Sequence, residues 1–317
     1  MSPTSIFSPE STPARWVFDL SLMVSTVCAA IFLVVVSLLT YSLIKFRKKP
    51  GDDASEPPQV YGSTQIELAW TIIPILIVLV LFLASARVIF YTRETRAAAP
   101  GDTVVDVVGH QFWWEYRYPD LGVVTANELH LPVADKGRGS RTLLQLYSAD
   151  TVHSFWVPRL AGKTDLIPNF PNTMWIDPER PGLYLGQCAQ YCGVQHAKML
   201  LRVYVQPRSE FNAWIAQQRR LAQPTEAVTR GRELFERTAC MDCHTISGTS
   251  ATGRFGPNLT HLMSRDTLAA GVLTNTRDNL RRWIADPSVF KPASLMPAMG
   301  FGDDDLNAVT DYLMTLR

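Results

Sequence analysis

The residues best suited to chemistry gather in one short segment, residues 188–199. They are two cysteines, a histidine and a methionine, namely Cys188, Cys192, His196 and Met199. Thiolate, imidazole and thioether groups are the donors that select copper for electron transfer. A zinc site would favour a closed set of Cys and His ligands without a thioether. The segment therefore predicts a copper centre rather than a zinc site.

A further ligand has to come from elsewhere, and His153 is the best candidate. A mononuclear blue-copper site uses one thiolate, two imidazoles and a weak axial thioether. The second cysteine of the segment is surplus to that set, and it permits two sulfurs to bridge two coppers. An exported cysteine pair would ordinarily suggest a disulfide. The neighbouring histidine at ligand spacing favours a metal site instead.

A second motif, Cys240-Met-Asp-Cys243-His244, has the Cys-x-x-Cys-His pattern that attaches a c-type haem. The cysteines would form thioether bonds and His244 would be the proximal iron ligand. A distal methionine would favour the high potential of an electron carrier. The downstream candidates are Met263, Met296, Met299 and Met314, of which Met314 is expected to be a core residue of the last helix.

Two apolar stretches without a charged residue occupy positions 20–44 and 68–86. A helix needs about 20 apolar residues to cross a bilayer, and both stretches suffice. Pro74 lies in the second, which membrane helices tolerate where neighbours satisfy the backbone. We predict two spans, at about 18–44 and 68–91, rather than two buried core helices.

Basic residues set the expected orientation. A cluster follows the first span, Lys45, Arg47, Lys48 and Lys49, and such clusters stay on the cytoplasmic side. Arg93 and Arg96 after the second span weaken this asymmetry only slightly. We expect both termini, and everything after residue 95, on the periplasmic or equivalent outer face. The N-terminus lacks a basic region and a cleavage site before its apolar run, which predicts an uncleaved anchor.

The 317 residues carry a net charge of +1, which gives no global case for nucleic-acid binding. Short β-type runs follow the spans, at 103–108, 112–118, 141–147 and 200–205. Glycine and proline separate them, as in an antiparallel sandwich or barrel. From residue 225 the pattern is helical, with helices at 230–237 and 277–285. A last helix begins at three aspartates and carries an apolar stripe of Leu306, Val309, Leu313 and Leu316.

These patterns predict a multidomain chain with four segments. They are a transmembrane hairpin at 1–97, a β domain at 98–207, a linker at 208–224 and an all-α domain at 225–317. The linker contains a helix that we expect to lead away from the β domain. Cys28 in the first span is expected to be a small apolar or lipid-facing residue. His110 and His130 are expected to be structural, and His261 to be a surface or supporting residue.

The chain resembles subunit II of a haem–copper cytochrome c oxidase, from the first span to about residue 207. The resemblance rests on the run at 188–199, His153, Gly-Lys-Thr-Asp-Leu-Ile-Pro at 162–168 and Gly-His-Gln-Phe-Trp-Trp at 109–114. It implies a binuclear CuA centre in a cupredoxin-like Greek-key barrel, with Cys188 and Cys192 bridging. His153 and Met199 would complete one copper. His196 and the backbone carbonyl of Gln190 would complete the other.

The fused haem domain makes the chain similar to the caa3-type oxidases, whose subunit II carries its own cytochrome c. In related domains the distal methionine belongs to a Met-Pro sequence, which favours Met296 over Met299. The segment 256–259 resembles the loop that packs on the proximal side of the haem. Glu67 corresponds to a carboxylate at the mouth of a proton channel of subunit I. A simple charge at the start of a helix is the alternative for that residue.

The sequence departs from the family pattern at two positions. Gln190 stands where the family commonly has a glutamate that helps to bind magnesium at the subunit I interface, so a magnesium site is in doubt. Phe112 stands where a tryptophan usually receives electrons from soluble cytochrome c. Trp113 and Trp114 remain available for an electron path, with a packing role as the alternative.

The resulting hypothesis is the electron-input subunit of a proton-pumping cytochrome c oxidase in a bacterial plasma membrane. Its expected partners are subunit I with haem a and the haem a3–CuB centre, subunit III, and an upstream cytochrome or quinol-oxidising complex as donor. Six histidines are present, none within the predicted spans, so oxygen reduction has to occur in a partner. The alternatives are the CuA subunit of a nitric oxide reductase and a membrane copper carrier. The haem motif argues against the carrier.

Overall fold

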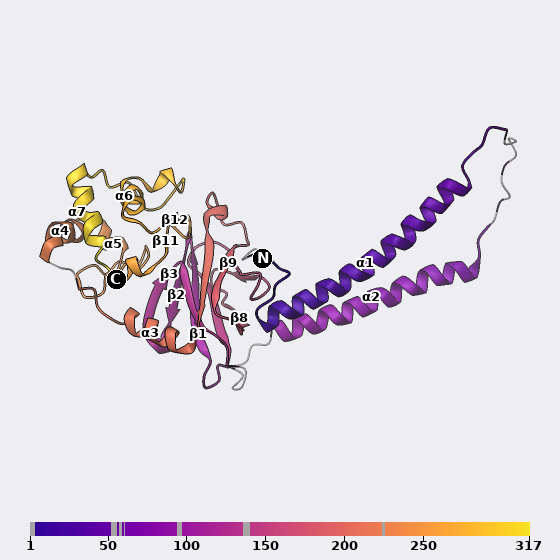
Figure 1. Ribbon diagram of the computed structural model, residues 1–317, viewed down its shortest axis with the longest axis horizontal. Coiled ribbons are helices and arrows are strands. Elements are labelled where there is room, and N and C mark those ends of the chain that lie inside the picture. The colour runs from indigo at the N-terminus through magenta and orange to yellow at the C-terminus, as the bar shows by residue number, and fades with distance from the viewer. Residues whose placement is uncertain are drawn as a thin grey trace. The chain divides into compact units, whose positions relative to one another are not determined.

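The computed structural model describes residues 4–51, 56, 59, 61–93, 97–135, 140–223 and 226–317. It divides into two compact units, one of Trp16–Arg93 and one of Met1–Arg15 with Glu94–Arg317. The first unit holds most of both long helices, and the second holds the β strands and the C-terminal helices (Figure 1). Arg96, one of the residues used to predict orientation, lies outside the described residues.

Two long apolar helices make up the first unit. Helix α1 spans Thr12–Lys45 and α2 spans Thr64–Thr92, and both are long and apolar enough to cross a membrane. Their large apolar side chains are exposed along almost the whole length, as lipid-facing residues would be. Pro74 lies inside α2. Cys28 is exposed and free of a disulfide. The prediction of two candidate spans is confirmed.

The β domain is built from two five-stranded sheets that pack face to face. One has the order β3-β2-β1-β5-β8 and the other β4-β10-β9-β6-β7. In chain order the strands are β1 (Thr103–His110), β2 (Trp113–Tyr118), β3 (Val123–Ala126), β4 (Glu128–Pro132), β5 (Thr142–Ser148), β6 (His153–Trp156), β7 (Thr164–Leu166), β8 (Asn172–Ile176), β9 (Gly182–Cys188) and β10 (Leu200–Gln206). A short helical turn, η1 (Pro119–Leu121), joins β2 to β3.

Alternating side chains build the core between these sheets. Val105, Val107, Leu144 and Leu146 point inward from β1 and β5 and are fully buried. The fold is the expected cupredoxin-like sandwich, but it is not purely antiparallel. Strand β1 pairs with β5 in parallel, and β10 pairs with β4 in parallel. Parallel neighbours need a crossover connection, and both pairs here are separated by strands of the other sheet.

Helix α3 (Arg208–Gln218) corrects one expectation. The sequence predicts a helix that leads away from the β domain, whereas Phe211 and Ile215 are buried in the β-domain core. The Trp214 ring stacks on His130, with 4.2 Å between ring centroids. Apolar residues at spacings of three and four form one face of this helix, and that face binds it to the sheet.

The C-terminal domain is helical around its own core. Its helices are α4 (Thr229–Arg237), α5 (Cys240–Cys243), α6 (Arg277–Ala285) and α7 (Asp303–Leu313). A short hairpin, β11 (Thr267–Leu268) with β12 (Leu273–Thr274), and the turns η3 (Glu226–Val228), η4 (Leu262–Ser264) and η5 (Pro287–Val289) complete it. The predicted stripe of Leu306, Val309, Leu313 and Leu316 is buried. Gly231 lets α4 pack tightly on α7, since a Cβ there would lie 2.0 Å from the Ala308 carbonyl oxygen.

The segment that precedes α1 is fastened to the β domain. Asp177 Oδ1 accepts hydrogen bonds from the Ser11 hydroxyl and the Thr12 N–H, each at 2.7 Å. The Glu10 N–H donates to the Arg159 carbonyl at 2.8 Å, and the Arg159 guanidinium donates to the Glu10 carboxylate at 2.9 Å. The start of α1 and the β domain are therefore held together.

Candidate copper and haem sites

The sulfur- and nitrogen-bearing residues at 188–199 are brought together by a hairpin. Cys188 ends β9, and the turn η2 (His196–Lys198) leads into β10. The hairpin closes where the Cys188 N–H donates to the Met199 carbonyl at 2.9 Å. His153 begins β6, whose Phe155 pairs with Cys188 of the neighbouring strand. The pairing of β6 with β9 thus places His153 beside the cysteine loop, although the two are far apart in sequence.

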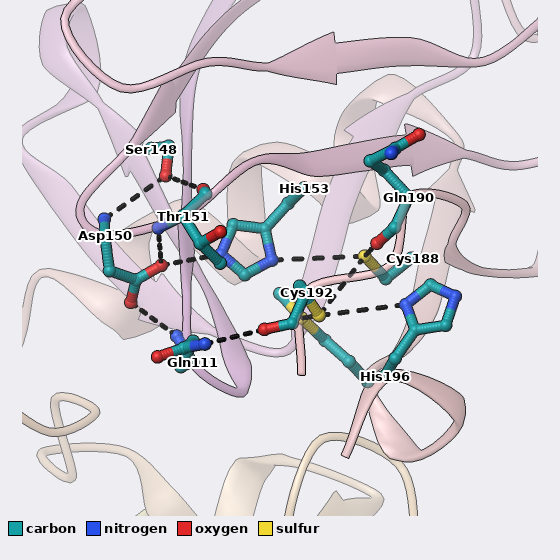
Figure 2. Close-up of polar contacts among 10 residues, drawn as sticks. Gln111, Ser148, Asp150, Thr151, His153, Cys188, Gln190, Cys192 and His196 are labelled. Atoms are coloured by element: carbon teal, nitrogen blue, oxygen red, sulfur yellow. Dashed lines mark hydrogen bonds and ion pairs between the residues drawn. The ribbon is translucent and has the colours of Figure 1, made fainter. Parts of the chain in front are cut away.

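The five side chains enclose a small volume around the two sulfurs. The Sγ atoms of Cys188 and Cys192 lie 3.9 Å apart. His153 Nδ1 lies 3.9 Å from the Cys188 sulfur, and His196 Nδ1 lies 3.7 Å from the Cys192 sulfur. The Met199 sulfur is 4.0 Å from that of Cys192. Figure 2 shows the two imidazoles on opposite sides of the sulfur pair.

Burial separates this cluster from water, apart from the half-buried His196. His153 and Met199 are fully buried, and both cysteines are nearly so. The ligand atoms of His153, Cys188 and Cys192 lie within 4.8 Å of one another, a spacing that can hold a metal ion. The sulfur–sulfur distance of 3.9 Å is far longer than the roughly 2.05 Å of a disulfide. Soft donors at these separations fit copper.

A carboxylate behind His153 fixes the ring. His153 Nε2 lies 2.8 Å from Asp150 Oδ1, which leaves Nδ1 facing the sulfurs. Burial lowers the pKa of His153, but the hydrogen bond to Asp150 and the nearby Cys188 outweigh it, so the pKa is raised. The pKa of Cys188 is lowered, because the Cys192 thiol and His153 hydrogen-bond to its sulfur. The loop therefore favours a thiolate, the form that binds metals.

Gln190 presents its backbone, rather than its side chain, to this cluster. Its carbonyl oxygen lies 3.2 Å from the Cys188 sulfur, and its side chain is exposed. Figure 2 shows the amide pointing away from the sulfurs. The geometry suits the main-chain ligand that the resemblance implies for this position.

The haem-attachment motif lies at a cavity in the helical domain. Cys240 and Cys243 are at the two ends of the short helix α5, and both line a cavity of about 220 Å³ together with His244. His244 Nδ1 donates to the Pro257 carbonyl at 2.8 Å, so Nε2 remains free for iron. Burial lowers the pKa of His244, which keeps the ring neutral. A Cβ on Gly256 would lie 2.6 Å from His244 Cε1, so a side chain at this position would displace the ring or the loop.

The candidates for the distal ligand divide into two pairs. Of the four, all in the described part of the chain, Met296 and Met299 line the cavity. Met263 and Met314 instead pack against the apolar core of the helical domain. The cavity admits either methionine, and the preference for Met296 stays a prediction.

The cavity has a polar residue that the sequence reasoning missed, Arg265. It lines the cavity, is 9% exposed, and donates to the Asn258 carbonyl at 2.5 Å. Its Nε is buried and has no hydrogen-bond partner among the described residues. A buried guanidinium with a free donor fits an acidic substituent of a cofactor such as haem. An isolated arginine before an aspartate carries no distinctive sequence pattern.

The two tryptophans differ in their surroundings. Trp114 is fully buried, and its ring lies 6.0 Å from that of His153 in an edge-to-face arrangement. Trp113 is half-buried, stacks on His110 at 4.2 Å, and lines the haem cavity. Phe112 also lines the cavity. One tryptophan is thus adjacent to the copper cluster and the other to the haem cavity.

The remaining residues of interest have diverse roles. His261 is 4% exposed, with Nε2 3.1 Å from the Gln218 and Arg220 carbonyl oxygens. Of its two expected roles, a surface residue or a supporting residue, the surface one is wrong. Its ring ties the end of α3 to the helical domain. His130 lies between the rings of Tyr204 and Trp214, in agreement with a structural role. Glu67 lies exposed in the first turn of α2.

Comparison with known proteins agrees with this architecture. The family models "Cytochrome C oxidase subunit II, transmembrane domain", "Cytochrome C oxidase subunit II, periplasmic domain" and "Cytochrome c" match residues 5–88, 136–205 and 228–317. Cytochrome c oxidase subunit 2 of Alkalihalophilus pseudofirmus is 34% identical over 98% of this chain and 90% of its own length. The protein of that name from Bacillus sp. strain PS3 is 32% identical over 86% of this chain and 80% of its own.

A solved structure also matches part of this chain. It is the periplasmic domain of subunit II of cytochrome oxidase of Bradyrhizobium japonicum, 27% identical, which covers 38% of this chain and 96% of that chain with a TM-score of 0.35.

The fold and the sites define a membrane-anchored redox protein with a cupredoxin-like domain and a cytochrome c domain. The chain belongs to the cytochrome c oxidase subunit II family, and is thus a component of a haem–copper oxidase in a membrane. Its domains imply copper and haem c as cofactors. The family resemblance predicted from the sequence is confirmed.

Proposed function

We propose that this chain is the electron-input subunit of a proton-pumping oxidase. When bound, a covalent haem c would accept electrons and a binuclear CuA centre would pass them on to a partner subunit that reduces oxygen to water. The observation that carries the proposal is the sulfur pair of Cys188 and Cys192, 3.9 Å apart, with an imidazole beside each sulfur.

The protein residues prepare the copper site before a metal arrives. Asp150 orients His153, and the Cys192 thiol stabilises a thiolate on Cys188. The buried position of Met199 excludes water from one side of the site. We infer that His153, Cys188, Cys192, His196, Met199 and the Gln190 carbonyl are the ligands. Four of these ligand residues, His153, Cys188, Cys192 and Met199, are buried, and ligands held by packing change little in geometry, which suits rapid electron transfer.

Haem binding would use a second set of residues. Cys240 and Cys243 would form the covalent bonds, His244 the proximal bond and Met296 the distal bond. Pro257 holds the proximal ring in the tautomer with a free Nε2. Arg265 supplies a buried positive charge for an acidic substituent. A distal methionine favours a high potential, as an electron carrier to copper requires.

The contacts before α1 support the proposed orientation. The segment at 10–12 is bonded to the β domain, which supports the proposal that the two ends of the helical hairpin face the same side of the membrane. An even number of spans between them follows. With the basic cluster at 45–49 inside, we propose that both termini and both redox domains lie on the periplasmic face.

We further propose subunits I and III as partners, and an upstream cytochrome or quinol-oxidising complex as the electron donor. Glu67 would collect protons at the cytoplasmic start of α2. A magnesium site at the subunit interface would lack the usual carboxylate, because Gln190 is a neutral amide. We propose domain boundaries at 97 and 224, the second of which lies outside the described residues, and α3 extends the β domain beyond the expected boundary at 207.

The test is a metal and haem analysis of the purified complex. We expect a mixed-valence copper signal from two coppers in this subunit and a haem that stays with the chain on a denaturing gel. A single copper, or none, without a mixed-valence signal would refute the proposal. The copurifying catalytic subunit distinguishes an oxygen-reducing complex from a nitric oxide reductase.

A further inference from the structure

The cytochrome c domain and the β domain meet in a contact that the sequence does not suggest. Both domains belong to one compact unit, and several hydrogen bonds join a residue of one to a residue of the other. The Leu200 N–H donates to the Ala270 carbonyl at 3.2 Å. The Tyr204 hydroxyl donates to Asp266 Oδ2 at 2.6 Å. These bonds connect β10 with the hairpin β11–β12.

A buried carboxylate anchors the first end of this contact. Glu128 of β4 is 2% exposed. Its Oε1 accepts from the Thr267 N–H at 2.8 Å and the Thr267 hydroxyl at 2.7 Å, and its Oε2 accepts from the Asp266 N–H at 3.1 Å. A buried carboxylate is costly unless hydrogen-bonded, and all of these donors come from the other domain. The carboxylate is thus satisfied when the domains are in contact.

The second end of the contact between the domains joins the loop that holds His196 with the loop that precedes Met296. Gln195 and Lys198 flank His196 in sequence. The Gln195 side-chain amide donates to the Pro292 carbonyl at 2.8 Å, and Lys198 Nζ donates to the Phe290 carbonyl at 2.5 Å. Both carbonyls lie just upstream of Met296. The intervening Lys291 is 3% exposed, and its Nζ donates to the Phe112 carbonyl at 2.7 Å. The copper loop and the distal haem loop are therefore bonded to each other.

Phe112 and Gln111 complete the connection. Both line the haem cavity. The Gln111 side-chain amide donates to the Cys192 carbonyl at 2.6 Å, and the Gln111 N–H donates to Asp150 at 2.7 Å. The dipeptide Gln111-Phe112 of the β domain thus lines the haem cavity and also hydrogen-bonds to Cys192 and Asp150 at the copper site.

We propose that Glu128 and Lys291 are positioning residues that hold the cytochrome c domain permanently docked on the copper domain, so that electron transfer between the two centres needs no domain movement. The inference rests on the proposed function. The contact between the domains can also be tested without it.

The experiment compares the E128A and K291M variants with wild type in the full chain, loaded with copper and haem in detergent. The controls, E233A and K163M, remove exposed charges of the same types. A photoexcited ruthenium complex reduces the haem, and the haem band and near-infrared copper band are followed at increasing glycerol concentration. A second readout is hydrogen exchange at the Asp266 and Thr267 amides, measured with and without the cofactors.

We expect the wild-type transfer rate to be independent of viscosity, since docked centres require no diffusion. Either variant should be slowed by about tenfold or more and become viscosity-dependent, as microsecond-to-millisecond domain motion becomes limiting. E128A should also expose both amides to exchange. E128Q, which keeps one carbonyl oxygen for Thr267, should recover part of the rate. Both optical bands should be unchanged in E128A, because Glu128 is neither a ligand nor part of the haem-cavity lining.

A wild-type rate that falls with viscosity would overturn the docking proposal while leaving the proposed function intact. So would variants that match wild type in both rate and exchange. If E128A does not fold, the rate and viscosity dependence of K291M, at the other end of the contact, test the docking proposal. A wild-type chain that binds neither cofactor would refute the proposed function instead, and amide protection would still report whether the domains dock.

Discussion

The copper cluster and the haem cavity are built in different ways. The copper cluster is enclosed within one domain, by a β hairpin and the first residue of β6. The haem cavity is lined by Cys240 and His244 from the helical domain, but also by Phe112 and Trp113 from the β domain. The copper cluster therefore depends on the geometry of one domain, whereas the haem cavity depends on the contact between two domains. The contrast teaches that changes in one site should leave the other intact unless they alter that contact.

The largest expected effect is that copper and haem can be removed independently of each other. The C188S/C192S double variant should lose all bound copper, because both bridging sulfurs are removed, while its haem stain stays at the wild-type level. The C240A/C243A double variant should lose the haem stain and keep copper. C28S is the matched control, since Cys28 is exposed in α1 and free. Copper loss in the haem variant would show that the sites are not independent.

Acid should weaken the β domain through His130. Burial lowers the pKa of His130 to about 4 from an ordinary value of 6.5. A depressed histidine pKa means that the unfolded chain binds the proton first, so stability is lost as pH falls from 6.5 through about 4. The loss approaches about 3 kcal/mol. Denaturant unfolding followed by tryptophan fluorescence should show this decline, and H130Q should remove it. A decline of equal size in H130Q would contradict this assignment.

Removing the support of a copper ligand should have a smaller effect. The D150A change removes the carboxylate that lies 2.8 Å from His153 Nε2, and it leaves every proposed copper ligand in place. Copper affinity should fall by about 10–100-fold, the usual cost of such a change. A competition titration with a copper chelator measures it, and D120A is the control, because Asp120 is an exposed residue of η1. An unchanged affinity would mean that Asp150 does not orient the ring.

The smallest effect is expected at the proximal side of the haem. In G256A the new Cβ would lie 2.6 Å from His244 Cε1, so the ring or the loop has to shift. We expect a loss of about 1 kcal/mol in the free energy of unfolding of the haem domain, typical of mild overpacking. Thermal unfolding followed at the haem band tests it. G162A, where a Cβ meets nothing within 4 Å, should be neutral.

The comparison also explains how far the sequence could predict the molecule. The bounds of α6, Arg277–Ala285, agree with the prediction because Thr276 caps one end and Pro287 follows the other. The copper residues lie in one short segment, so their proximity follows from spacing, while their roles as ligands stay a prediction. Strands β3, β4 and β6–β9 were not predicted, and all of them except β9 are too short to carry much alternation. Arg265, Glu128 and Lys291 were missed because their environment is created only when two domains come together.

The most direct test of the account is an anaerobic reductive titration of the purified complex, in which the c-type haem band and the near-infrared copper band are followed together. We predict that both bands respond, with electrons distributed between one haem and a mixed-valence copper pair on this chain. A haem band that titrates without any near-infrared copper band would contradict the account.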